Sequence, residues 1–391
     1  MQASILSQFY LDPDIIFLNH GSFGATPRPV FMDYQKWQYR LEQQPVKFLG
    51  REYSGFLLEA RQKLGKYLHI SSDDLVLIPN TTYGVNIVAR SIHLQPGDEI
   101  LSTDHEYGAC DRIWQFICDQ NQAIYRQQPV HIPFISAEEF VEALWQGVTE
   151  RTRLIFLSHI TSPTSTIFPV AAICRRARQQ GITTLVDGAH APGQIPLNLL
   201  ETGADFYTGN CHKWMMAPKG SAFLYSHPSV QGLVEPLVIS WGWQAEAAFS
   251  TGSQFIDYLQ WYGTRDPAAH LAIPAAIDFM ELQHWDQVRS DCHNLAKEAV
   301  QRISTLFEKP SYYGKNDTLY AQMASLPLPG EWELTDLKNT LYDEFKIEIP
   351  CISWKGRKFL RISVQSYNSL DDVLALESAL QSIYVRGTYA T

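Results

Sequence analysis

Short apolar runs that alternate with helix-length segments are the feature that most constrains the fold of this chain. Parallel strands need long crossover connections, and helix-length segments between strands supply them. We therefore predict an α/β fold with a large, mostly parallel sheet covered by helices. The strands are expected near residues 75–78, 99–102, 154–158, 183–186, 204–208 and 222–225.

The two ends of the chain differ from its middle, and 391 residues exceed what one core usually holds. A β-like run at 15–18 enters a loop rich in glycine and proline, which indicates an arm over residues 1–25 that joins the smaller domain. We predict a large α/β domain over 26–267 and a smaller α+β C-terminal domain over 268–391. The elements expected in the latter are helices at 268–284, 285–309, 334–343 and 370–382 and strands near 318–323, 347–349 and 359–364.

Composition and charge exclude several classes of function. A formal net charge of −10 argues against nucleic acid as a partner, because phosphate binding needs a basic surface. Residues 1–14 do not have the pattern of a signal peptide, and no window reaches the roughly 18 apolar residues of a membrane span, so we expect a cytoplasmic protein without membrane contact. The six cysteines form no CxxC pair, so we expect neither a metal site nor a disulfide framework.

An acid and a lysine follow two neighbouring strands of the predicted sheet. The run at 183–186 ends at Asp187, and the strand near 204–208 leads into a turn that carries His212 and Lys213. Ligands of open α/β sheets bind at the carboxyl ends of the strands. A carboxylate that holds a pyridinium nitrogen and a lysine that forms an imine are the groups that pyridoxal 5'-phosphate requires. A helix N-cap for Asp187 and a solvated surface charge for Lys213 are the alternatives.

Five further residues carry weaker signals. His190 is placed to hydrogen-bond a cofactor, although a lone histidine is often structural. Thr81 and Thr82 open a helix after the strand at 75–78, as phosphate sites do, but threonines also cap helices. Tyr107 follows a strand and is suited to stacking on a planar ring, or to core packing. Arg361 stands inside the strand at 359–364, where it binds either a substrate carboxylate or an acid of this chain.

Taken together, these motifs resemble the class-V aminotransferase family of fold-type-I pyridoxal-phosphate enzymes, and within it the isopenicillin N epimerase-like branch. The similarity runs nearly end to end. The segments that carry it are Asn19-His20-Gly21-Ser22-Phe23-Gly24, Asp187-Gly188-Ala189-His190, Thr208-Gly209-Asn210-Cys211-His212-Lys213-Trp214, Gly263-Thr264-Arg265-Asp266-Pro267, Arg361-Ile362-Ser363 and Tyr367-Asn368.

The resemblance implies a role for each matched residue. It makes Lys213 the Schiff-base lysine, Asp187 the partner of the pyridine nitrogen and Tyr107 the aromatic residue that stacks on the ring. It assigns the substrate to Arg361 and Asn19. Thr264 would reach the phosphate of the neighbouring subunit's cofactor, which implies a homodimer with shared active sites. The residues that it assigns to the phosphate are Thr81, Thr82, Asn210 and His212.

The reaction that the resemblance implies begins when Lys213 removes the α-proton of an amino acid or amino-acid-derived substrate. Proton return to the opposite face gives epimerisation, for which Tyr107, His105 and Cys351 are candidate second acids. A cysteine or cystine C–S lyase or a desulfurase-like enzyme is the alternative, and a non-catalytic cofactor-binding protein is a further one. A metal hydrolase built from Asp187, His190 and His212 would leave Lys213 unexplained.

Cysteine desulfurases present a nucleophilic cysteine on a flexible loop upstream of the carboxylate-binding arginine. The one cysteine of this chain near that place is Cys351, ten positions before Arg361 (361 − 351 = 10). It follows Pro350 in what reads as a continuing strand, so we expect a packed thiol instead of a mobile carrier of persulfide.

Overall fold

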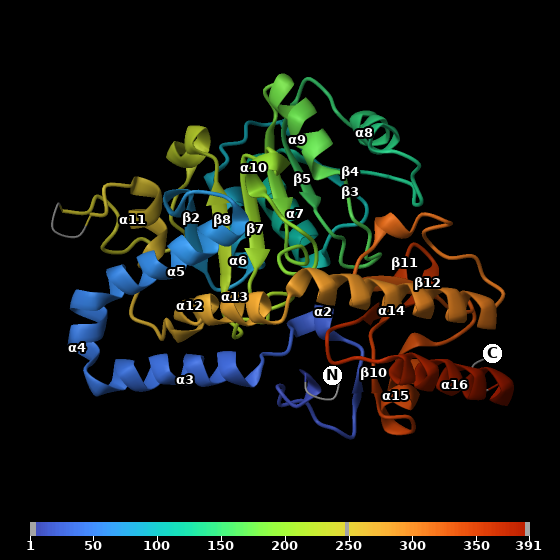
Figure 1. Ribbon diagram of the computed structural model, residues 1–391. Helices are drawn as coiled ribbons and strands as arrows, with labels where there is room; N and C mark the ends of the chain where they lie inside the picture. The colour runs from blue at the N-terminus through green and yellow to red at the C-terminus, as the bar shows by residue number, and fades with distance from the viewer. Residues whose placement is uncertain (1–4, 247–249, 388–391) are drawn as a thin grey trace.

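A seven-stranded sheet forms the centre of the molecule in the computed structural model, which describes residues 5–246 and 250–387 (Figure 1). The strand order is β2-β8-β7-β6-β5-β3-β4, with parallel pairing from β7 to β4 and antiparallel pairing on both sides of β8. This arrangement confirms the predicted mostly parallel sheet. The strands are β2 (Leu75–Ile78), β3 (Glu99–Thr103), β4 (Ile124–Gln128), β5 (Thr152–Ser158), β6 (Thr183–Asp187), β7 (Phe206–Asn210) and β8 (Ala222–Ser226).

Helices cover both faces of this sheet, so its strands are apolar on both sides. Ile155 and Leu157 of β5 enter one core with α5, α9 and α13, whereas Leu154 and Phe156 enter a second core with α6, α7 and α11. This two-sided burial explains the continuous apolar runs of the sequence. The helices around the sheet are α5 (Tyr53–Leu68), α6 (Thr81–Ser91), α7 (Gly108–Asn121), α8 (Ala137–Trp145), α9 (Val170–Gln179), α10 (Leu199–Thr202), α11 (Gln254–Gln260) and α13 (Ile273–Leu282).

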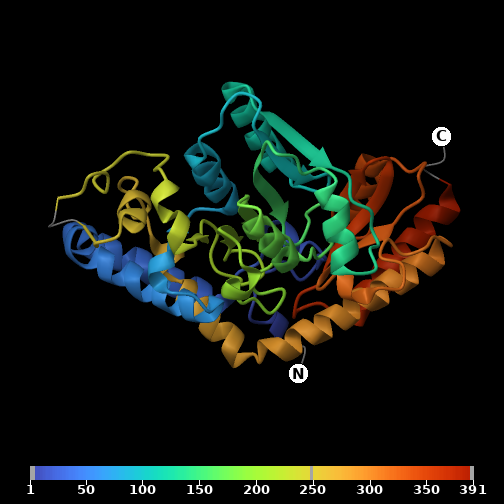
Figure 2. The same ribbon diagram turned by 90° about the horizontal axis from the view of Figure 1, so that it is seen from above.

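The C-terminal part forms its own layer beside the large sheet. A three-stranded antiparallel sheet has the order β11-β12-β9. The long helix α14 connects the two regions and runs along the lower edge of the view in Figure 2. Seen from above, the C-terminal residues lie at one end and α11 at the other (Figure 2). The elements of this part are α14 (Trp285–Leu306), β9 (Met323–Pro327), α15 (Leu334–Asp343), β10 (Ile347–Glu348), β11 (Cys351–Trp354), β12 (Arg357–Ser363) and α16 (Leu370–Arg386).

The N-terminal segment is joined to this C-terminal layer. β1 (Ile16–Phe17) pairs in parallel with β10, and Asn19 forms a bridge with Ser363 at the end of β12. The chain then continues through α2 (His20–Phe23) to α3 (Arg28–Gln43). The domain boundaries at 25 and 267 stay predictions. No helix within residues 5–246 and 250–387 is long and apolar enough to cross a membrane.

Three local expectations were wrong. The strand expected at 318–323 begins only at Met323, because Asn316 caps a single 3-10 turn over Asp317–Leu319. The helix expected over 268–284 is divided into α12 (Ala268–Leu271) and α13, where Pro274 lacks the N–H that a continuous helix needs. β4 was not predicted, because this edge strand is largely exposed and has no apolar pattern.

Candidate active site

Asp187 lies at the carboxyl end of β6, in the middle of the large sheet, where it is 4% exposed. Its Oδ1 accepts a hydrogen bond of 2.8 Å from the Ala189 amide, and the Cys110 thiol lies 3.6 Å from its Oδ2. Burial raises the pKa of Asp187, while the Ala189 amide and the charge of Lys213 act in the opposite direction. No ion-pair partner of Asp187 is found in the described part of the chain, and such a buried carboxylate suits a cationic ring nitrogen.

The amine of Lys213 lies in the loop after β7, and its Nζ is 3.2 Å from Nε2 of His190. Burial, and then the charge of Arg361, lower the pKa of Lys213 to about 8. About a tenth of this amine is therefore neutral at pH 7, far more than for a free lysine, and the neutral form is the one that acts as a nucleophile. Trp214, Met215, Met216 and Ala217, which follow Lys213, are fully buried, and this contradicts the surface-charge alternative.

The proton on His190 can be placed from its neighbours. The indole Nε1–H of Trp214 lies 3.3 Å from His190 Nδ1 and can only donate, so Nδ1 accepts. Burial holds the pKa of His190 well below its usual value, so the ring is neutral and carries its proton on Nε2. This N–H donates to Nζ of Lys213, and the contact favours the neutral amine.

The start of α6 lies beside the end of β7 and offers the features of an anion site. The Thr81 amide donates to Oδ1 of Asn210 at 2.9 Å, and Asn80 caps the helix through the Tyr83 amide. Thr81 Oγ1 is buried and has no hydrogen-bond partner among the described residues. An orphaned hydroxyl at the positive end of an eleven-residue helix fits a phosphate group, and Thr82 is the next residue of that turn.

His212 lies on the same side of β7. Its Nδ1 is 2.9 Å from the Ser221 carbonyl oxygen, which can only accept. Burial and the charge of Lys213 lower the pKa of His212 to about 4, so the free site holds a neutral ring with Nε2 as an acceptor. A phosphate dianion beside Nε2 would raise this pKa and turn Nε2 into a donor.

Arg361 is buried, with 5% of its surface exposed, and a buried positive charge usually has an acidic partner. Arg361 has none in the described part of the chain. Its Nη1 donates to the carbonyl oxygen and to Oγ of Ser162 at 2.8 Å and 3.0 Å, and its Nη2 donates to Ser22 Oγ at 3.1 Å. Its Nε has no partner among the described residues. These neutral acceptors contradict the structural ion pair that the sequence left open, and a ligand carboxylate fits the two remaining N–H groups, on Nε and Nη2.

Tyr107 lies near Arg361, on the exposed side of the site. It is the N-cap residue of α7, is 47% exposed, and lies near enough to Arg361 to counteract the lowering of that pKa, which burial brings to about 10. Thr264 lies apart from this group, exposed in the loop between α11 and α12. Tyr262 of that loop lies 5.7 Å from Tyr83 of α6, ring centre to ring centre.

Two of the candidate second acids are unsuited to that role. His105 is fully buried, and both of its ring nitrogens are used, Nδ1 with Thr164 Oγ1 at 2.9 Å and Nε2 with the Val130 carbonyl oxygen at 3.0 Å. Cys351 lies in β11 opposite Leu360, and burial raises the pKa of its thiol to about 12. This position of Cys351 agrees with the expectation of a packed thiol. Neither His105 nor Cys351 is therefore a suitable proton donor to the substrate.

Sequence reasoning missed several residues that contact this group or lie close to it. Glu106 is buried, accepts from Thr103 and from the amide and hydroxyl of Ser158, and has a pKa raised by burial to about 8. Cys110, Ser162 and Ser22 had no signal of their own, because small polar residues in loops and first helical turns are common. Only Ser22 belonged to a segment that was singled out.

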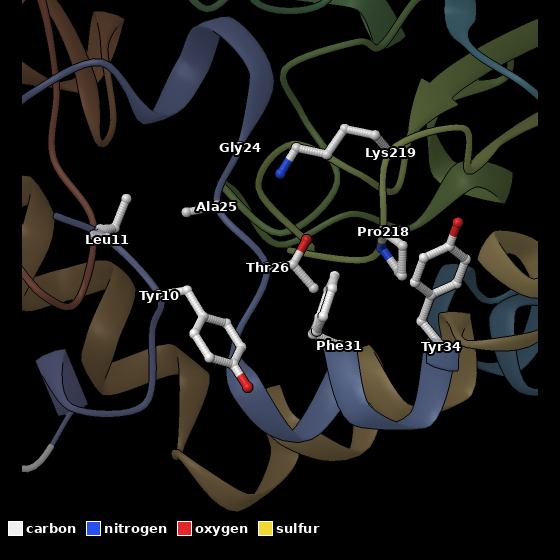
Figure 3. Close-up of a pocket in the computed structure, with 9 residues that line it drawn as sticks. All are labelled: Tyr10, Leu11, Gly24, Ala25, Thr26, Phe31, Tyr34, Pro218 and Lys219. Carbon is white, nitrogen blue, oxygen red and sulfur yellow. The ribbon is translucent and has the colours of Figure 1, made fainter. Parts of the chain in front are cut away.

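A second lysine near the site has a different environment. Lys219 extends into a cavity of about 630 Å³ between residues 24–26 and the start of α3 (Figure 3). The residues that line it include no carboxylate and no other residue of the group around Lys213. Of these two amines, only Lys213 lies beside an acid and a histidine.

Comparisons with known proteins find a family model and relatives that match most of the length of this chain. The family model described as Aminotransferase class-V matches residues 24–376. The isopenicillin N epimerase of Amycolatopsis lactamdurans is 33% identical over 97% of this chain and 98% of its own. A probable chloroplastic L-cysteine desulfhydrase of Arabidopsis thaliana is 27% identical over 100% of this chain and 87% of its own.

Among solved structures, the cystine C–S lyase C-DES in complex with its reaction product cysteine persulfide aligns with a TM-score of 0.80 at 21% identity, over 94% of this chain and 98% of that chain. The apo cysteine desulfurase of Thermococcus onnurineus NA1 aligns with a TM-score of 0.83 at 20% identity, over 98% of both chains. At these identities the likeness concerns the fold.

Proposed function

We propose, because the chain belongs to the class-V aminotransferase family of pyridoxal-phosphate enzymes with the type I fold, that it removes and returns the α-proton of an amino acid or amino-acid-derived substrate. The reaction that we favour is epimerisation, as in the isopenicillin N epimerase-like branch. The observation that carries the proposal is the buried guanidinium of Arg361, which has only neutral acceptors among the described residues and lies close enough to Lys213 for its charge to lower the pKa of that amine.

The residues at this edge of the sheet fit pyridoxal 5'-phosphate, the cofactor of the family. Lys213 would bind its aldehyde, Asp187 its ring nitrogen, and Tyr107 the face of its ring. His190 would lie beside the linkage. The residues that would hold the phosphate are Thr81, Thr82, Asn210 and His212. When bound, the cofactor withdraws electrons from the α-carbon and so makes its proton acidic.

The side chains of this chain then have separate tasks. Arg361 would hold the substrate carboxylate through its free Nε, which fixes the α-carbon in front of the amine. Burial lowers the pKa of Lys213 to about 8 and the His190 Nε2–H favours its neutral form, so Nζ would take the α-proton from one face of the α-carbon. Asp187 would keep its negative charge and so hold the proton on the ring nitrogen.

Epimerisation needs a proton donor on the face opposite Lys213. Of the three candidates from the sequence, Tyr107 is the one that retains this role, because its side chain is exposed and borders Arg361. His105 and Cys351 are committed to the packing of other regions. We therefore assign the second proton transfer to the Tyr107 hydroxyl.

A cysteine or cystine C–S lyase is the second candidate, and the position of Cys351 favours it over a desulfurase. Loss of a β-substituent requires the same Arg361 and Lys213 but neither a second acid nor a protein thiol. Desulfurase chemistry would need a mobile thiol, whereas Cys351 is fixed in β11. The desulfhydrase named among the relatives agrees with this alternative.

We also propose a homodimer. Thr264 is exposed on its own subunit beside Tyr262, whose ring contacts the helix that begins at Thr81. An exposed threonine in this loop is available to the phosphate site of a second subunit.

The test is exchange of the α-hydrogen in deuterated water, followed by NMR, with isopenicillin N, L-cysteine, L-cystine and a panel of amino acids. We expect the holoenzyme to exchange one class of substrate and the Lys213→Ala variant to lose exchange. Lys219→Ala is the matched control and should retain it. Chiral chromatography then detects epimerisation, and pyruvate with sulfide detects elimination. Absence of exchange with every compound would support the non-catalytic alternative and contradict the proposal.

A further inference from the structure

We infer that Glu348, Asn19 and Ser22 form a hydrogen-bond chain of fixed direction that orients Arg361 toward its ligand, and that they are positioning residues. The inference rests on the proposed function, because it takes Arg361 as the residue that binds the substrate carboxylate. It also changes the expectation for Asn19, which we now place behind the arginine instead of against the substrate.

The four side chains are linked end to end. Arg361 Nη2 donates to Ser22 Oγ at 3.1 Å, and the Ser22 hydroxyl donates to Asn19 Oδ1 at 2.5 Å. Asn19 Nδ2 then donates to Glu348 Oε1 at 2.8 Å. The chain therefore connects the guanidinium to a carboxylate through two neutral side chains, with no direct ion pair between its ends.

The two ends of the chain determine the direction of every hydrogen bond. A guanidinium can only donate and an ionised carboxylate can only accept. Ser22 must therefore accept from Arg361, which turns its own proton toward Asn19. Asn19 must present its oxygen to Ser22 and its NH₂ group to Glu348. If the residue at 348 donated instead, the Asn19 amide would face Ser22 with its NH₂ group, and Ser22 would lose its acceptor.

The backbone fixes the positions of these side chains. β1 pairs with β10 so that Phe17 lies opposite Glu348, and the Leu18 amide donates to the Glu348 carbonyl oxygen at 3.0 Å. Asn19 is bridged to Ser363, two residues after Arg361. The N-terminal segment thus lies between the strand that carries the acid and the strand that carries the arginine.

The hydrogen bond from Arg361 to Ser22 matters because, without it, the guanidinium is held only at Nη1. Ser162 accepts twice from Nη1, and Ser22 is the acceptor of Nη2. Without Ser22 the guanidinium can rotate about its single fixed edge, and its free Nε no longer points in one direction. Binding of a planar carboxylate depends on that direction.

The experiment measures how strongly the holoenzyme discriminates in favour of a carboxylate. The absorbance of the bound cofactor is titrated with L-alanine, which has no β leaving group, and with ethylamine, which is the same amine without the carboxylate. The readout is the ratio of the half-saturating concentration of ethylamine to that of L-alanine. Both amines react at the same lysine linkage, so ethylamine reports whether the rest of the site is intact.

The variants separate the effect of hydrogen-bond direction in the chain from the effect of a change in net charge. Ser22→Ala and Glu348→Lys should each lower the ratio about tenfold. Ser22→Ala removes the acceptor of the charged Arg361 Nη2, and Glu348→Lys turns the Asn19 amide around, so that the Ser22 hydroxyl loses its own acceptor. Glu348→Gln should retain most of the discrimination, because its amide oxygen still accepts from Asn19. Glu344→Lys is the control for the change of charge, since Glu344 pairs with Arg386 on the surface.

Each outcome distinguishes the inference from the proposed function. If Arg361→Met leaves the ratio unchanged, the proposed carboxylate site is wrong. If Arg361→Met lowers the ratio but Ser22→Ala and Glu348→Lys do not, the positioning chain is wrong and the function stands. An equal loss in Glu348→Gln and Glu348→Lys would also overturn the chain, because its direction would not matter. Ser22→Ala lies on a different element, so the test does not depend on the folding of Glu348→Lys.

Discussion

The imidazole Nε2 of His20 lies 3.1 Å from the backbone carbonyl oxygen of Lys213, 193 positions away in the sequence. Burial lowers the pKa of His20 to about 3, so the ring is neutral, and Nε2 carries the proton because a carbonyl oxygen can only accept. Nδ1 then accepts from the Tyr367 hydroxyl at 2.9 Å. The N-terminal segment therefore supports the lysine loop from behind.

Replacement of His20 tests this support. We expect His20→Ala to leave the Lys213 carbonyl and the Tyr367 hydroxyl without partners and to lower the free energy of unfolding by about 1–3 kcal/mol. Urea unfolding of the wild type and the variant measures the loss. Substitution of His93, an exposed histidine at the end of α6, is the control and should change stability by less than about 0.5 kcal/mol. Equal stability of His20→Ala and the wild type would contradict a supporting role.

The lowered pKa of Lys213 predicts how cofactor loading depends on pH. The amine attacks an aldehyde only when it is neutral, so the rate of loading of the apoenzyme should rise with pH through about 8. In Arg361→Met the midpoint should move to higher pH, because the charge of Arg361 is one cause of the lowered value. Stopped-flow absorbance over pH 6 to about 10 follows the reaction. A midpoint that does not move would show that burial alone sets this pKa.

Gly84 allows α6 to approach β7 closely. A Cβ atom at this position would lie 2.3 Å from Thr208 Oγ1 and 2.8 Å from Ile78 Cδ1. We expect Gly84→Ala to lower the free energy of unfolding by about 1–3 kcal/mol and to weaken cofactor binding, because the helix start that carries Thr81 must shift. Calorimetry and titration with pyridoxal phosphate measure the two effects.

Gly55→Ala in α5 is the matched control, since nothing lies within 4 Å of its added Cβ. This variant should gain up to about 1 kcal/mol from the better helix propensity of alanine. If both alanine variants behaved alike, the close approach at Gly84 would not be what limits the packing of α6.

Glu106 predicts that stability falls as pH rises. Its pKa is about 8 in the folded protein, and the ordinary value is 4.5, so between these values the folded state holds a proton that the unfolded state has lost. The stability contributed by this group is fully present below about pH 4.5 and is lost as pH approaches about 8. Urea midpoints from pH 5 to about 8 should fall less steeply in Glu106→Gln than in the wild type. Parallel curves would assign the pH dependence to other groups.

Much of the fold followed from patterns that depend on local sequence. β5, β6 and β8 are buried on both faces, and their continuous apolar runs revealed them. β4 escaped prediction because it is held by pairing with β3 and not by burial of its side chains. The break between α12 and α13 was missed because the helical spacing of apolar residues continues through Pro274. From the sequence alone, a single helix and two helices were both possible.

The site was predictable only where chemistry restricts the residue type. Lysine, aspartate and arginine stood out because few roles suit them at strand ends or inside a strand. Ser22, Ser162 and Cys110 act through contacts with residues far away in the sequence, and such contacts exist only in the folded chain. His105 misled for the same reason, since its two partners lie outside its own segment.

The bridge between Asn19 and Ser363 also sets an order of events during folding. Loop closure over such a separation is slow compared with local pairing. During synthesis the large sheet has all seven of its strands once Ser226 has been added, but Arg361 and the strand that bridges Asn19 come more than a hundred residues later (361 − 226 = 135). A ribosome-bound chain can therefore complete the sheet while Asn19 still lacks its bridge partner, and catalytic competence arrives with the last strand to be synthesised.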